Sequence, residues 1–93
     1  MDQERKPFWW VRLVIEFEQY YGPFKVRAQA QRFADREKCE TEVLQDAGVD
    51  GSYLELNGGE VKPPSRYMVF RSGRVVPFSP ENLHEWVKRE FHL

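Results

Sequence analysis

The side chains that could do enzymatic chemistry are few in this sequence, and they are not grouped. The two histidines, His84 and His92, are eight residues apart. A helix would separate them by about two turns, which is too far for a shared metal ion. The single cysteine, Cys39, lies in an apolar pattern, where a small buried side chain is a better interpretation than a nucleophile. We therefore predict no metal site.

Glycine, serine and carboxylate patterns lead to the same conclusion. The Gly-Gly pair at 58–59 is not followed by the Lys-Ser/Thr of a P-loop, and Ser65 and Ser72 lack the context of a nucleophile elbow. Glu16 and Glu18 share one strand face and could form an acid–base pair, but no nucleophile or orienting group accompanies them. We predict that the protein is not an enzyme and uses no cofactor.

Aromatic and arginine side chains offer a different chemistry, which is recognition of a partner surface. Trp, Tyr and Arg are the residue types that dominate protein–protein hot spots. The residues that we expect to contact a partner protein are Trp10, Arg12, Tyr20, Lys25, Arg27 and Phe33. The competing interpretation is that Trp10 packs beneath the N-terminal arm or the 57–65 loop and that nothing binds there.

The expected position of these residues depends on two antiparallel strands within residues 8–33, around Gly22-Pro23. Odd positions from Trp9 to Phe17 are apolar in the first arm, and even positions from Phe24 to Ala30 are apolar in the second. A turn at Gly22-Pro23 pairs odd positions with even ones, so both apolar sets face one side. The opposite face then carries the aromatic and arginine residues, and we expect it to be open.

The rest of the chain predicts a mixed α+β fold with the element order β-β-α-β-β-β-α. Residues 35–47 show a helical apolar stripe, and residues 52–56 alternate as a short strand. Residues 66–78 predict a hairpin around Ser72-Gly73, and Ser79-Pro80-Glu81 is a helix start.

The length of the chain predicts one domain. We expect residues 1–7 to be a flexible lead-in and residues 8–93 to form a single small domain. This domain has a largely antiparallel sheet with two helices packed on one face.

Composition and charge narrow the classes of partner. The 93 residues carry a net charge of −1, so the basic field of a duplex-DNA-binding protein is absent. The sequence contains no apolar run of membrane-spanning length, its start is charged, and one cysteine excludes an internal disulfide. We expect a cytoplasmic protein with no membrane partner.

These observations favour a small non-enzymatic adaptor or inhibitor that binds another protein, of the kind that phages and mobile elements encode. Single-stranded nucleic acid is the alternative ligand, because aromatic side chains interleaved with Arg and Lys on an open sheet can stack bases. A second copy of the chain, paired through an edge strand or through the same face, is a further alternative.

Overall fold

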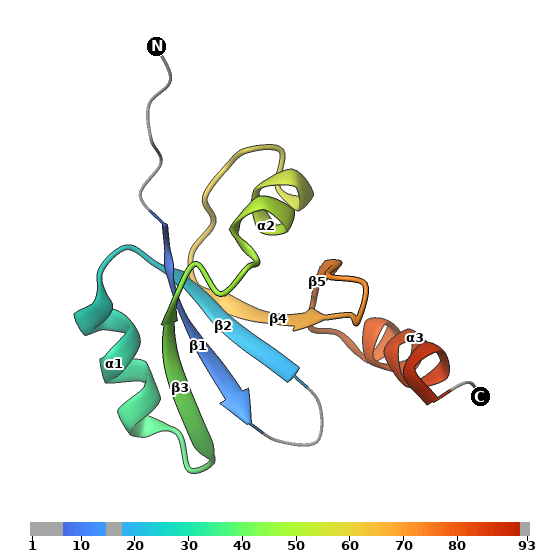
Figure 1. The fold of residues 1–93 in the computed structure, drawn as a ribbon, viewed down its shortest axis with the longest axis horizontal. Coiled ribbons are helices and arrows are strands. Elements are labelled where there is room, and N and C mark those ends of the chain that lie inside the picture. The colour runs from blue at the N-terminus through green and yellow to red at the C-terminus, as the bar shows by residue number, and fades with distance from the viewer. Residues whose placement is uncertain (1–6, 15–17, 92–93) are drawn as a thin grey trace.

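The computed structural model describes residues 7–14 and 18–91 of the chain, and it has an α+β fold (Figure 1). Residues 1–6 of the expected lead-in lie outside the described residues. The bounds of the elements are β1 Trp9–Val14, β2 Glu18–Phe24, α1 Arg27–Arg36, β3 Glu40–Gln45, α2 Asp50–Leu56, β4 Ser65–Val69, β5 Val75–Pro77 and α3 Pro80–Phe91. The predicted fold class is confirmed, although the order of elements, β-β-α-β-α-β-β-α, differs from the expected one.

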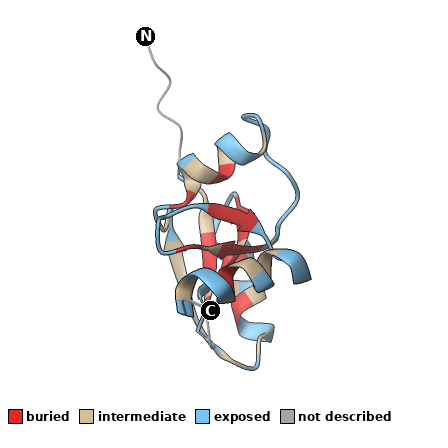
Figure 2. Cartoon of the chain, turned by 90° about the vertical axis from the view of Figure 1, so that its right-hand side faces the viewer, coloured by how far each residue is buried: buried red, intermediate tan, exposed pale blue. Residues whose placement is uncertain are grey.

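The strands form one antiparallel sheet in the order β3-β1-β2-β4-β5. Along β1, Val11 and Leu13 point to one face and Trp10 and Arg12 to the other, because successive side chains of a strand alternate. Buried residues concentrate in the strands, whereas the outer sides of the helices are exposed (Figure 2).

Helices cover both faces of this sheet, so the expectation of helices on one face only was wrong. On one face, Ala30 and Ala34 of α1 pack in a cluster with Val11 of β1. On the opposite face, Tyr53 of α2 packs against Trp10. Each face of β1 therefore has its own apolar core.

The third helix packs near the other end of the sheet. Its residue Trp86 lies in a cluster with Met68 of β4 and Val76 of β5. The strand register places Met68 beside Gln19 and Gln19 beside Leu13, so α3 lies against the same face as α1.

The predicted hairpin around Gly22-Pro23 is wrong. β1 and β2 do pair in antiparallel fashion, but Arg12 lies opposite Tyr20, and Gly22-Pro23 lies inside β2. The register shifts between Trp9 and Val11, which is where β2 passes through Gly22-Pro23. A bulge tolerates a proline because the ladder hydrogen bonds are already interrupted there. Residues 15–17, which connect the two strands, lie outside the described residues.

The predicted second arm of that hairpin becomes α1. Its Ala, Gln and Arg residues are good helix formers, and Ala30, Phe33 and Ala34 recur at helical spacing. Two of the even positions that suggested a strand, Val26 and Ala28, are exposed. The alternation in residues 24–30 therefore does not mark a buried strand face.

The middle of the chain exchanges helix and strand relative to the prediction. Residues 40–45, expected inside a helix, form β3, in which Thr41 and Val43 lie opposite Leu13 and Val11. Residues 50–56, expected to include a strand, form α2. Segments of six or seven residues are too short for intrinsic propensity to decide, and pairing with β1 outweighs it.

The last third of the chain agrees with the prediction. β4 and β5 form the expected hairpin, with Met68 opposite Val76. Helix α3 starts at Pro80. The Ser79 hydroxyl accepts a hydrogen bond from the backbone N–H of Asn82 at 3.1 Å, as a helix N-cap does.

Candidate protein-binding surface

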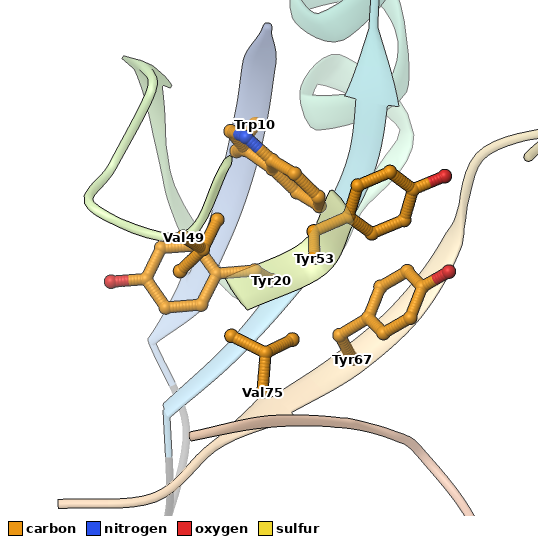
Figure 3. Packing of buried hydrophobic residues seen from close by; sticks show 6 residues of the cluster. All are labelled: Trp10, Tyr20, Val49, Tyr53, Tyr67 and Val75. Carbon is orange, nitrogen blue, oxygen red and sulfur yellow. The ribbon is translucent and has the colours of Figure 1, made fainter. Parts of the chain in front are cut away.

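The face of β1 and β2 that we expected to be open is covered by α2 over part of its area. Trp10 is fully buried, and Tyr20 is 7% exposed. The Trp10 ring lies edge-on to Tyr53 at 5.5 Å and to Tyr67 at 6.1 Å between ring centroids (Figure 3). Trp10 and Tyr20 are core residues, so the expectation that they contact a partner on an open face was wrong. Of the two interpretations of Trp10, the buried one holds, but the covering element is α2.

A hydrogen bond fixes the Trp10 ring in this core. The indole Nε1 donates to Oδ1 of Asp50 at 2.7 Å, and the Phe8 amide donates to Oδ2 of the same carboxylate at 3.0 Å. Burial raises the pKa of Asp50 above its ordinary value, although both hydrogen bonds oppose this rise. Asp50 therefore ties the start of β1 to the start of α2.

Arg12 lies on the part of this face that α2 leaves uncovered, but its charge is already compensated. Its guanidinium is 3.1 Å from a carboxylate oxygen of Glu18 and 3.2 Å from one of Glu42. The negative charge of Glu18 is the largest influence that raises the pKa of Arg12. Arg12 therefore offers little free charge to a partner.

The other three predicted contact residues lie elsewhere, on α1 or just before it. Lys25 and Arg27 are exposed at the start of α1. Phe33, half-buried on the same helix, stacks on Tyr21 of β2 with 4.0 Å between ring centroids and 13° between ring planes. The predicted set thus divides into a buried or neutralised half on one face and an accessible half around α1.

A groove beside α1 brings further residues to this accessible half. It has a volume of about 380 Å³ and runs between α1 and the end of β2. Its lining consists of Tyr21, Phe24, Gln29, Arg32, Phe33, Arg36 and Pro64. We call these seven residues the basic–aromatic surface; Lys25 and Arg27 do not line the groove.

The sequence analysis did not identify Arg32 and Arg36 as surface residues of a site, although their spacing indicates it. Gln29, Arg32, Phe33 and Arg36 follow one another at spacings of three, one and three, which places them on one side of a helix. The stripe is visible only when residues 27–36 are taken as a helix rather than as a strand.

Arginines without an ion pair distinguish α1 from the rest of the described chain. Eight arginines lie in residues 7–14 and 18–91, and five of them form ion pairs: Arg12, Arg66, Arg71, Arg74 and Arg89. The other three are Arg27, Arg32 and Arg36, all on α1. Residues 25–36 contain four basic residues and one acidic residue, a net charge of +3 in a chain whose total is −1.

The charge at the start of α1 does not serve the stability of the helix, although Arg36 in the last turn is favoured by the macrodipole. Arg27 is in the first turn, where the helix macrodipole disfavours a cation, and this turn contains no acidic residue. The helix also begins without a side-chain cap at Val26. The one acidic residue of α1, Asp35, accepts a hydrogen bond from Gln31 at 2.9 Å rather than pairing with an arginine.

The residues considered for enzymatic chemistry are not assembled into a site. Cys39 is half-buried beside the α1 core, and His84 is exposed on α3. His92 and Glu16 lie outside the described residues. Within residues 7–14 and 18–91, no three His, Cys, Asp or Glu side chains lie close enough to share a metal ion.

The chain has no detected relative from which a role for this surface could be taken. No family model, no curated protein and no solved structure matches the chain. Among the helices of the described residues, none has the length and apolar character needed to cross a bilayer.

Proposed function

We propose that this protein is a non-enzymatic module that binds a partner protein through the basic–aromatic surface of α1 and β2. The observation that carries the proposal is the segregation of charge. Every described arginine outside α1 is ion-paired, whereas Arg27, Arg32 and Arg36 are exposed and take part in no ion pair within the described residues.

An acidic partner surface would supply the missing counter-charges. Arginine binds carboxylates through two parallel hydrogen bonds, and such contacts are among the stronger ones at protein interfaces. The aromatic side chains of Tyr21 and Phe33 line the same groove as Arg32 and Arg36 and add the apolar area that an interface centre needs. A role as adaptor or inhibitor fits a chain of this size that presents one contact surface.

Single-stranded nucleic acid is the alternative ligand for the same surface. Glu18, whose negative charge would repel phosphate, belongs to the face opposite α1 and pairs with Arg12. Against nucleic acid stands the net charge of −1, because long-range attraction to a polyanion depends on the field of the whole molecule. A local contact with an acidic protein needs only the local charge, so we favour a protein partner.

Charge reversal on α1 tests the proposal. The immobilised protein is exposed to host extract, and bound proteins are compared by mass spectrometry between wild type and the double variant Arg32→Glu, Arg36→Glu. A matched control, Lys62→Glu with Lys88→Glu, makes the same change of net charge at exposed positions outside the surface. We expect a specific partner that the α1 variant loses and the control retains, with dissociation constants of the purified pair that follow the same order.

Two results would contradict the proposal. One is a partner that both double variants retain equally, since its binding site would then lie elsewhere. The other is an oligothymidylate that binds wild type in fluorescence anisotropy with a steep salt dependence while no protein depends on Arg32 and Arg36. All variants must show wild-type circular dichroism and melting, which is expected because the substituted side chains are exposed.

A further inference from the structure

The groove beside α1 gives the proposed protein partner a more specific chemistry. Three aromatic rings line it: Tyr21 and Phe33 stack at 4.0 Å, and Phe24 lies 6.0 Å and 6.1 Å from them. Pro64 completes the apolar part of the lining. A volume of about 380 Å³ is at the low end for a small-molecule site, and the groove can take one large apolar side chain of a partner.

Two arginine side chains lie beside the aromatic rings that line the groove. Arg32 and Arg36 line the groove from α1, four residues apart, so their Cβ atoms are about 5–6 Å from each other. Two carboxylates on either side of an apolar anchor could each pair with one guanidinium. Gln29, one turn before Phe33, places an amide at the same border, where it can donate to and accept from a peptide backbone.

The arrangement of the rings favours an apolar side chain over a nucleic-acid base. The faces of Tyr21 and Phe33 are turned toward each other, and Phe24 is tilted by 31° and 42° relative to them. Each of the stacked rings therefore has one face already occupied, which reduces what a base could stack on. Ring edges and the remaining surfaces can still pack against an aliphatic or aromatic anchor.

Resting on the proposed function, we infer that the basic–aromatic surface recognises a short acidic segment of the partner in which one large apolar side chain is flanked by carboxylates. The apolar side chain enters the groove, and the flanking carboxylates pair with Arg32 and Arg36. Burial of the apolar side chain supplies affinity, and the two charge pairs fix the position of the segment on the surface.

Two synthetic peptides of equal charge test this inference. Both consist of aspartate and glutamate with capped ends, and the central residue is leucine in one and serine in the other. Isothermal titration calorimetry should show that the leucine peptide binds about tenfold or more tightly than the serine peptide, as burial of a leucine side chain implies. Arg32→Glu with Arg36→Glu should abolish the binding of both.

A second pair of variants separates the groove from the charge. Gln29→Trp places a bulky ring over the groove, and Ala28→Trp places the same ring on the neighbouring exposed position, which does not line it. The preference for the leucine peptide should disappear in Gln29→Trp and persist in Ala28→Trp. Amide shifts in a heteronuclear NMR spectrum should fall on α1 and the end of β2 in wild type.

The outcomes distinguish this inference from the proposed function. Equal affinity for the two peptides, or a leucine preference that survives Gln29→Trp, overturns the groove inference but leaves a partner that depends on Arg32 and Arg36. If neither peptide binds and charge reversal leaves partner capture unchanged, both proposals fail. Tighter binding of oligothymidylate than of either peptide overturns the acidic segment in favour of nucleic acid.

Discussion

Gly22 lies against the Trp10 ring, and no other glycine has an atom within 4 Å of its Cβ position. A Cβ atom at Gly22 would lie 2.7 Å from Cε3 of the Trp10 ring and 3.1 Å from the carbonyl oxygen of Trp9. The backbone of Gly22 is not in the left-handed region, so space rather than φ requires glycine here. Glycine at this position leaves room for the Trp10 indole in the core that it shares with Tyr53.

The first prediction concerns this contact. Gly22→Ala should lower the free energy of unfolding by about 1–3 kcal/mol, because the buried Trp10 ring cannot move away without disturbing its neighbours. Urea denaturation followed by tryptophan fluorescence measures the change. Gly51→Ala is the matched control: no atom lies within 4 Å of its Cβ position, and alanine suits helix α2 better than glycine. A Gly22→Ala variant as stable as the control would show that the Trp10 contact is not restrictive.

Asp50 gives the second prediction, a pH dependence of unusual sign. Burial, with a smaller contribution from the charge of Asp46, raises the pKa of Asp50 in the folded protein, and the hydrogen bonds from Trp10 and Phe8 only partly offset this. A carboxyl whose folded-state pKa is raised stabilises the fold fully below its unfolded pKa, which is about 3.9. This contribution is lost as the pH rises through the higher, folded-state value.

Denaturation of wild type and Asp50→Asn from about pH 3 to about pH 7 isolates this contribution. The stability of wild type relative to Asp50→Asn should be greatest at the acid end and should decline as the pH rises, since the variant cannot ionise at this position. Carboxyls distant from Asp50 titrate in both proteins and cancel in the difference, which leaves the contribution of Asp50 together with its coupling to Asp46. A difference that grows with pH would mean that the hydrogen bonds outweigh burial and that the pKa of Asp50 is lowered.

At the scale of elements, the sequence predicts the fold well where local signals are redundant. The hairpin of β4 and β5 has a Ser-Gly turn between two apolar runs, and α3 has a serine cap, a proline in its first position and one apolar stripe. Each of these signals alone would be weak, but they agree with one another. The α+β class and these last three elements were therefore predictable from residues 65–91.

The middle of the chain was not predictable because its local patterns are ambiguous. In residues 40–45 the apolar residues Val43 and Leu44 are adjacent, which suits either a helix stripe or a strand that is covered on both faces. The deciding fact is that β1 offers Val11 on one face and Trp10 on the other, opposite Val43 and Leu44 respectively. That pairing is a tertiary contact with no signature inside the segment itself.

The residues of the candidate site were also predicted only in part. Lys25, Arg27 and Phe33 were chosen from residue type and from their place on the outer face of a predicted strand, but the segment that contains Arg27 and Phe33 is the helix α1. Trp10 and Tyr20 were misplaced because an aromatic residue on a strand face looks the same whether a partner or a helix covers it. The helix that covers them, α2, was not predicted, because the residues Ser52–Leu56 alternate as they would in a strand.

At the scale of the whole molecule, charge and sheet edges together bear on self-association. The sheet has two open edges among the described residues, β3 and β5. β5 has three residues and ends in Pro77, which has no N–H to donate, so it is a poor template for a further strand. β3 is six residues long and is the edge at which a second copy could pair.

Antiparallel pairing of β3 with its copy allows only a few registers, because residues directly opposite each other must lie on the same face. A two-fold axis at Thr41 places Glu40 opposite Glu42, and an axis at Glu42 places this glutamate opposite its own copy; like-charge pairs of this kind are destabilising. An axis at Val43 places Glu42 opposite Leu44. In every register the two copies of α1, each in a segment of net charge +3, lie on the same side of the seam, so all three registers are electrostatically unfavourable.

The third prediction is therefore that the protein is a monomer and that two glutamates keep it so. Multi-angle light scattering of wild type should give the 11.1 kDa mass of one chain at every accessible concentration. Glu40→Thr with Glu42→Val removes the like charges and supplies β-branched residues, so this variant should form a dimer through β3.

The matched control, Glu55→Thr with Glu60→Val, removes the same charge from exposed positions outside the sheet and should stay monomeric. A wild-type dimer would contradict this prediction, and its loss on Arg32→Glu with Arg36→Glu would place the interface at the basic–aromatic surface rather than at β3.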